Sequence, residues 1–130
     1  GELGMAWDDS LIIPCEKWSP DAAARALSAY LDSNPVPEAL FCFTDSMALG
    51  ALSVLSKRGI RVPDDVAVAG FDDIGHAEFA VPALTTVSFD KRQVASEALR
   101  LLTERMGNRE GPQRVVAVDY EIVERESTGP

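Results

Sequence analysis

Apolar positions along the chain form short continuous runs that alternate with stretches of helical spacing. The runs are rich in small and β-branched residues and are bounded by polar turns, which is typical of buried strands. They predict strands at residues 11–13, 39–43, 66–69, 84–89 and 115–118. Residues 120–123 are either a continuation of the last strand or one more strand.

Helices are predicted between these strands. Ser19 precedes a proline, which is a start signal, because a serine oxygen caps a helix and proline fits its first turn. Thr44 and Asp45 directly follow a strand and predict the start of a second helix, which runs to Arg58. Apolar residues three and four positions apart predict a third helix over residues 91–106.

The alternation of strands and helices predicts an α/β fold, a three-layer, Rossmann-like domain with a mostly parallel sheet. Residues 66–69 are apolar throughout. We expect them to form the central strand, covered on both faces and ended by Gly70. The polar residues 124–130 are expected to fray.

The second predicted helix, residues 46–58, is apolar around most of its circumference. Such a helix needs cover on two sides. The sheet supplies one side, and we expect a second subunit to supply the other, which predicts a homodimer. The candidate interface residues, two of which lie in a later loop, are Leu49, Leu52, Phe79 and Val81.

The chain has 130 residues, the length of one domain. Its net charge of −9 disfavours unaided binding to nucleic acid or to an anionic membrane. No apolar run approaches the roughly 20 residues of a membrane span, and no leader resembling a signal peptide is present. Cys15 and Cys42 lie in apolar segments, so we expect buried free thiols and a reducing, cytoplasmic setting.

Polar and aromatic side chains follow three of the predicted strands at their carboxyl ends, where ligands of open α/β sheets bind. They are Trp18, Thr44 with Asp45, and Asp72. Carboxylates and a hydroxyl bind vicinal hydroxyl groups, and an indole covers the apolar face of a sugar or a base. These residues therefore predict a site for a sugar-like or nucleoside-like ligand.

Each of these residues also has a simpler interpretation. Trp18 would pack over a helix start, and Asp45 would only cap a helix. Asp72 and its neighbour Asp73 would only form a turn.

Catalytic and metal chemistry has little support in the sequence. The single histidine, His76, lies in a predicted loop without an evident serine or cysteine partner. There is no phosphate-binding loop, no dinucleotide motif and no spaced set of metal ligands. We therefore expect no cofactor, no metal site and no enzymatic activity.

Five segments resemble motifs of the LacI/GalR-type bacterial transcription regulators. Phe-Thr-Asp-Ser-Met-Ala-Leu-Gly-Ala at 43–51 resembles the strand-to-helix signature of that family, and Gly-Phe-Asp-Asp at 70–73 resembles one of its turns. Residues 59–66, 82–87 and 123–128 resemble its motifs G-x-x-V-P-x-D-V, P-x-L-T-T-V and V-x-R-x-S-T. The order and spacing match over roughly residues 18–128.

The resemblance implies a periplasmic-binding-protein type I core, in which two lobes enclose a small effector. It implies that the chain senses an effector and dimerises within a transcription regulator. Asp72, Thr44 and Trp18 match positions that contact the effector in the family, and Asp45 is the aspartate beside them. Thr44 departs from the asparagine that the family usually has there.

The resemblance also implies that the chain is a fragment. Residues 1–90 match most of the C-terminal lobe, 91–120 a segment that returns to an absent N-terminal lobe, and 121–130 a tail. DNA would then be bound only through a helix-turn-helix domain that is not in this chain. Two alternatives stay open: a sugar-binding protein of a transport system and a phosphate- or nucleotide-processing α/β enzyme.

Overall fold

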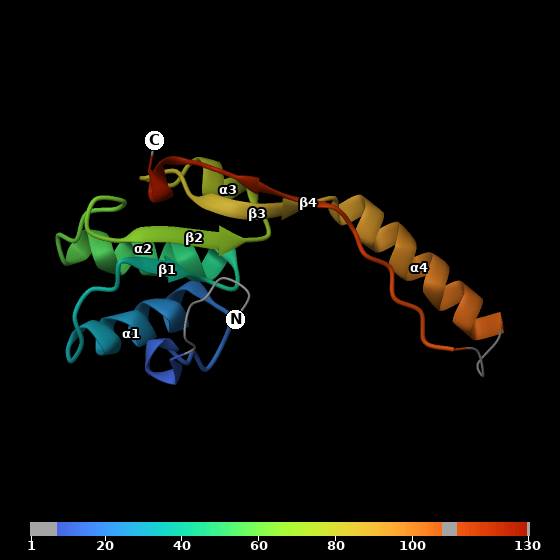
Figure 1. The fold of residues 1–130 in the computed structure, drawn as a ribbon, viewed down its shortest axis with the longest axis horizontal. Helices are drawn as coiled ribbons and strands as arrows, with labels where there is room; N and C mark the ends of the chain where they lie inside the picture. The colour runs from blue at the N-terminus through green and yellow to red at the C-terminus, as the bar shows by residue number, and fades with distance from the viewer. Residues whose placement is uncertain (1–7, 108–111, 130) are drawn as a thin grey trace.

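A computed structural model describes residues 8–107 and 112–129, whose four strands form one open sheet in the order β1-β2-β3-β4 (Figure 1). The parallel strands are β1 (Ala39–Phe41), β2 (Ala67–Phe71) and β3 (Thr85–Phe89). The last strand, β4 (Tyr120–Val123), pairs antiparallel with β3. The predicted α/β class with a mostly parallel sheet is confirmed.

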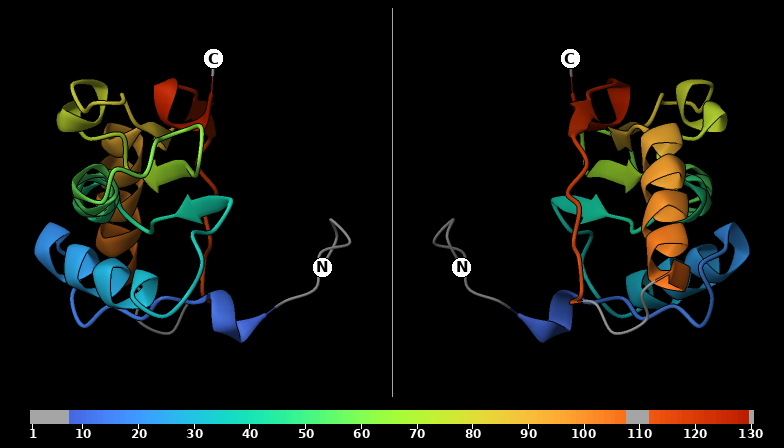
Figure 2. Two further views of the ribbon diagram at one scale, coloured as in Figure 1. Left: turned by 90° about the vertical axis from the view of Figure 1, so that its left-hand side faces the viewer. Right: turned by 90° about the vertical axis from the view of Figure 1, so that its right-hand side faces the viewer.

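Two helices begin where the sequence predicts. In α1 (Pro20–Leu31) the Ser19 side chain accepts a hydrogen bond from the Ala22 amide. In α2 (Asp45–Lys57) the Thr44 hydroxyl accepts one from the Met47 amide at 3.2 Å. Helix α2 packs on β2, and α1 packs on α2 (Figures 1 and 2).

Helices α1 and α2 approach so closely that only glycine fits between them at position 50. A methyl group on Gly50 would lie 2.1 Å from the carbonyl oxygen of Pro20. Helix α2 buries residues on several sides, and Leu49 is only partly exposed. The cover that we expected from a second subunit is therefore supplied for the most part by α1.

The predicted strand at residues 11–13 is wrong. Residues 12–13 have no regular structure, and Leu11 is the last residue of a short 3-10 turn, η1 (Asp9–Leu11). A strand needs a neighbour to pair with. In the described part of the chain, a cavity of about 190 Å³ lies between this segment and β1, and Ile12 and Leu40 are among the residues that line it.

The two cysteines line the same cavity. Both are free thiols, as expected, with Cys42 buried and Cys15 half-buried. Burial raises the pKa of the Cys42 thiol to about 12, so this thiol stays protonated near neutral pH. Cys42 is thus a core residue and not a nucleophile.

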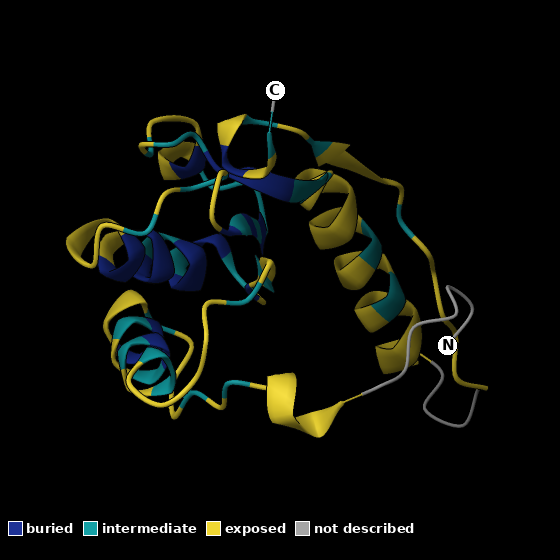
Figure 3. Cartoon of the chain, turned by 60° about the vertical axis from the view of Figure 1, so that its left-hand side comes forward, coloured by how far each residue is buried: buried dark blue, intermediate teal, exposed yellow. Residues whose placement is uncertain are grey.

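Helix α4 (Lys91–Gly107) leaves the end of β3 and extends away from the sheet, and residues 112–119 run back beside it (Figure 1). The predicted helix is confirmed, but the predicted strand at 115–118 has no regular structure, and the last strand is β4. An ion pair between Glu104 and Arg114 joins α4 to the segment that runs back beside it. Most of α4 is exposed (Figure 3). None of the helices described is long and apolar enough to cross a membrane.

One face of the sheet lacks a covering helix within the described residues. Val68 is buried on the α2 side, whereas its neighbour Ala69, on the other face, is only half-buried. The expectation that both faces are covered is thus not met. A hollow of about 410 Å³ on this face is lined by Phe41, Phe71, Val87, Phe89, Val94, Val118 and Tyr120.

The described tail residues, 124–129, do not fray as predicted, because they dock on the sheet through a 3-10 turn, η2 (Glu126–Thr128). The buried Ser127 hydroxyl donates to the Val68 carbonyl at 2.6 Å and accepts from the Thr85 amide at 2.8 Å. The Ser127 amide donates to the Ala83 carbonyl at 2.9 Å. These bonds tie the last residues to two strands of the sheet.

Candidate functional site

The candidate site is the turn that follows β2, at the carboxyl ends of the parallel strands. Gly70 lies within the strand and does not end it, because β2 continues to Phe71. Asp72 (φ 110°) and Asp73 (φ 47°) then have positive φ angles, which residues other than glycine rarely adopt. The chain continues into a short helix, α3 (Gly75–Glu78), where the sequence predicted an irregular segment.

Asp45, in the first turn of α2, is hydrogen-bonded to the segment that follows Asp72 and Asp73. It is 0% exposed, and its Oδ2 accepts a hydrogen bond from the Ile74 amide at 2.9 Å. Its Oδ1 accepts one from the Thr86 hydroxyl at 2.6 Å. A methyl group on Gly70 would lie 2.3 Å from Oδ1, so the glycine leaves the space that the carboxylate occupies.

Asp73 is bound to the tail. Arg125 donates to Asp73 Oδ1 at 2.9 Å and to the Leu84 carbonyl at 2.8 Å. The Arg125 guanidinium holds the pKa of the Asp73 carboxyl below its usual value, because the ion pair favours the charged form. The Asp73 amide donates to the Thr86 hydroxyl at 3.3 Å. Asp73 is therefore a structural part of the turn.

Asp72 differs from its two acidic neighbours. Among the described residues, no hydrogen bond to its carboxylate is formed. Its partial burial and the nearby charge of Asp45 raise the pKa of Asp72 above its usual value, since both disfavour the charged form, while Lys91 acts in the opposite sense. Among the described residues, the fold thus leaves the carboxylate of Asp72 without a donor, unlike those of Asp45 and Asp73.

The structure brings together some of the predicted site residues but not all. Thr44 and Asp45 lie beside the Asp72 turn, because Asp45 bonds to Ile74. Trp18 is 74% exposed at the start of α1, and no hydrogen bond of the described residues links it to the turn. A contact of Trp18 with a ligand stays a prediction.

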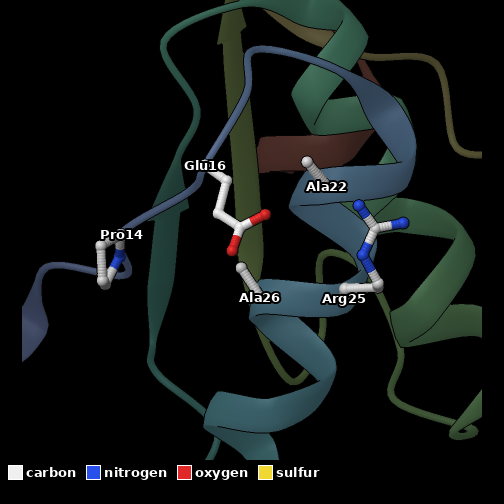
Figure 4. A pocket seen from close by; sticks show the side chains of 5 residues that line it. All are labelled: Pro14, Glu16, Ala22, Arg25 and Ala26. Atoms are coloured by element: carbon white, nitrogen blue, oxygen red, sulfur yellow. The ribbon is translucent and has the colours of Figure 1, made fainter.

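A separate hollow of about 250 Å³ lies between α1 and the segment that precedes it (Figure 4). Glu16 points toward α1 there, with its carboxylate near the methyl group of Ala26, whereas Arg25 pairs with Asp21 at 2.9 Å. None of the predicted site residues lines this hollow. Its polar groups do not converge on one point, so it offers no comparable site.

The predicted interface residues have different environments. Leu52 is 7% exposed and belongs to the core, so its surface is not free for a second subunit. Leu49 is partly exposed and packs against the same core. Phe79 and Val81, after α3, are 80% and 91% exposed. Phe79 and Val81 are thus the two apolar residues of this set that lie in solvent.

The sequence did not assign roles to Thr86 and Arg125, although both form hydrogen bonds with Asp73 in the turn. Both lie in segments that resemble family motifs, Thr86 in residues 82–87 and Arg125 in residues 123–128. That coincidence was the available signal. Physically, Thr86 and Arg125 hold the turn at Asp73 and the tail against the sheet by hydrogen bonds.

Comparisons with known proteins agree with this geometry. The model of the periplasmic binding protein-like domain matches residues 5–128. The HTH-type transcriptional repressor PurR of Vibrio atlanticus is 40% identical over 124 residues, which are 95% of this chain and 37% of that protein. The chain belongs to the periplasmic binding protein-like domain family.

Two solved structures are similar in fold and in sequence. A LacI-type transcription regulator from Bifidobacterium animalis subsp. lactis has a TM-score of 0.85 at 39% identity, with 97% of this chain and 45% of that chain covered. A LacI family transcriptional regulator from Arthrobacter sp. FB24, in complex with lactose, has a TM-score of 0.78 at 35% identity, with 98% and 46% covered.

The resemblance to LacI/GalR-type regulators that the motifs indicated is confirmed by these relatives. The chain spans a little over a third of the length of the PurR relative, at 37%. The relatives are transcriptional regulators, and none of those named here is described as an enzyme or a transport protein.

Proposed function

We propose that this chain senses a small effector for a LacI-type transcription regulator, and that Asp72 is the carboxylate that binds the effector. The observation that carries the proposal is the contrast between three acidic residues of one site. Asp45 and Asp73 have hydrogen-bond partners, whereas Asp72 has none among the described residues. An acceptor left over at the carboxyl edge of a parallel sheet is placed to bind a ligand.

The effector is sugar-like or nucleoside-like, because a carboxylate and the Thr44 hydroxyl suit ligand hydroxyl or amino groups. One structural neighbour is described in complex with lactose, which supports the sugar class. The protein is a cytoplasmic regulator and not an enzyme. Its other parts supply an N-terminal lobe and a helix-turn-helix that binds DNA, and residues 91–107 and 112–120 reach toward that lobe.

Asp72→Asn is expected to weaken binding of the effector by about 1–3 kcal/mol, the scale of a hydrogen bond to a charged group. The variant keeps the size of the side chain, so the fold should be unchanged. Titration calorimetry on the full-length protein, with lactose and adenosine as probes, measures the loss. Asp64→Asn is the matched control, since Asp64 is exposed and pairs with Arg61 in a distant turn. Equal affinity of the wild type and Asp72→Asn would remove Asp72 from the site.

We further propose that the protein is a homodimer in which Phe79, Val81 and the exposed part of Leu49 contact the second subunit. Exposed apolar residues that gather in one place mark interaction surfaces. A twofold contact presents the same surface from both subunits, so one substitution changes the interface twice.

Phe79→Glu is expected to convert the dimer to a monomer, because burying an aromatic side chain contributes about 1.5–3 kcal/mol per subunit. Analytical ultracentrifugation of both forms at matched concentration measures the change. Leu99→Glu on α4 is the control, since Leu99 is also exposed and apolar but lies on another element. A wild type that stays monomeric at high concentration, or a Phe79→Glu variant that dimerises as tightly, would exclude this surface.

A further inference from the structure

We propose that Asp45 is a positioning residue that sets the affinity for the effector by holding the Asp72 turn, together with Thr86, and does not touch the effector. This inference rests on the proposed binding role of Asp72. It changes the role that the sequence suggested for Asp45, which was a direct contact with the ligand.

The burial of Asp45 excludes direct contact in this conformation. Its side chain is 0% exposed, and no buried polar side-chain atom of the described residues lacks a hydrogen-bond partner. Each carboxylate oxygen accepts one hydrogen bond, from the Ile74 amide at 2.9 Å and from the Thr86 hydroxyl at 2.6 Å. A ligand that reached Asp45 would have to displace one of these donors.

The hydrogen bonds of Asp45 hold the two residues that follow Asp72 in place. The Thr86 hydroxyl, which donates to Asp45, also accepts from the Asp73 amide at 3.3 Å. The amides of Asp73 and Ile74 are thus both held, one through Thr86 and one by Asp45 itself. The Asp72 amide is held separately, by the Val87 carbonyl at 3.0 Å. Asp45 and Thr86 therefore control the turn after Asp72, and the sheet controls its start.

The conformation of the turn needs this support. Asp72 and Asp73 have φ angles of 110° and 47°, which cost free energy for residues with a Cβ. Such a conformation persists only where surrounding bonds hold it. Without the Asp45 and Thr86 bonds, the backbone would relax and the Asp72 carboxylate would point elsewhere. Asp45 itself belongs to the first turn of α2, so its hydrogen bonds fix the Asp72 turn relative to that helix.

The first measurement needs no ligand. Amide hydrogen exchange, read by NMR on this chain, compares the wild type with Asp45→Asn and Thr86→Val. An Asn amide cannot accept with its NH₂ group, so one of the two donors loses its acceptor whichever way it is oriented. We expect exchange at Asp73 and Ile74 to become about tenfold faster or more, with little change at Asp72 as the internal control. Thr86→Ser restores the hydroxyl and should recover the wild-type exchange.

The second measurement is calorimetric affinity for lactose and adenosine in the full-length protein. Asp45→Asn and Thr86→Val should each weaken the binding of the better probe by about tenfold, and the double variant by little more than either, since both act through one set of bonds. If Asp45 contacted the ligand directly, Thr86→Val would leave the affinity near that of the wild type. That result would overturn the inference.

The outcomes separate the two proposals. Unchanged exchange at Asp73 and Ile74 in folded Asp45→Asn and Thr86→Val overturns the positioning role, whatever the affinities are. Faster exchange with unchanged affinity for a probe that the wild type binds overturns it as well. If neither probe binds the wild type, or if Asp72→Asn binds as well as the wild type, the proposed function fails. The exchange data then still decide whether Asp45 holds the turn. Should Asp45→Asn not fold, the Thr86 pair of variants carries the same test.

Discussion

Gly50→Ala is expected to lower the free energy of unfolding by about 3 kcal/mol, the upper part of the range for overpacking in a core. In most helices alanine is favoured over glycine by about 1 kcal/mol, so the expected sign is opposite to that of intrinsic propensity. The reason is the contact of α2 with α1. The new methyl group would lie 2.1 Å from the Pro20 carbonyl oxygen, which is backbone and cannot rotate away.

Urea unfolding followed by circular dichroism measures this loss, with Gly75→Ala as the matched control. A methyl group on Gly75 would meet nothing within 4 Å, so this variant should change the stability by no more than about 0.5 kcal/mol. Equal stabilities of the wild type and Gly50→Ala would show that α1 does not pack on α2 as the structure describes.

Arg125→Met is expected to cost about 3 kcal/mol at neutral pH, because it removes the charged donor of both the Asp73 carboxylate and the Leu84 carbonyl. The Arg125 and Asp73 side chains are only 17% and 25% exposed, so water replaces the lost bonds poorly. The control is Arg61→Met, whose ion pairs with Asp64 and Asp65 are exposed. It should cost no more than about 0.5 kcal/mol.

The cost of Arg125→Met should also depend on pH. The Arg125 ion pair lowers the pKa of Asp73 from its usual 3.8. A lowered pKa contributes stability that is complete above the unfolded-state pKa and is lost as the pH falls through the folded-state pKa. The difference between the wild type and Arg125→Met should therefore shrink as the pH is lowered through and below 3.8, while the part due to Leu84 remains. A difference that stays constant from about pH 7 to about pH 3 would contradict the ion pair.

The sequence was sufficient where local signals decide. The caps at Ser19 and Thr44 set the starts of α1 and α2, and the apolar run at 66–69 marked the central strand. The sequence was insufficient where a strand forms only if another strand lies beside it. Residues 11–13 have the composition of a strand but no strand beside them in the described chain, so no ladder forms.

The same limit applies to the candidate site. The sequence placed Thr44, Asp45 and Asp72 at the same edge of the sheet, and their proximity follows from parallel strands. It could not show that Asp45 is fully bonded while Asp72 is not, because the deciding donors, Thr86 and the Ile74 amide, come from distant positions. The apolar surface of α2 was likewise ambiguous, since periodicity does not say whether a helix of the same chain or a second subunit covers it.

Residues Phe89 and Tyr120 stand opposite each other in the antiparallel pair of β3 and β4. Helix α4 and the segment that returns from it therefore leave and re-enter the sheet at one place, and α4 buries no residue of its own. Lengthening such an excursion costs little, about 0.6 kcal/mol for each doubling of a flexible loop. Insertions and deletions between these two strands should thus be tolerated by the sheet and leave the turn at Asp72 as it is.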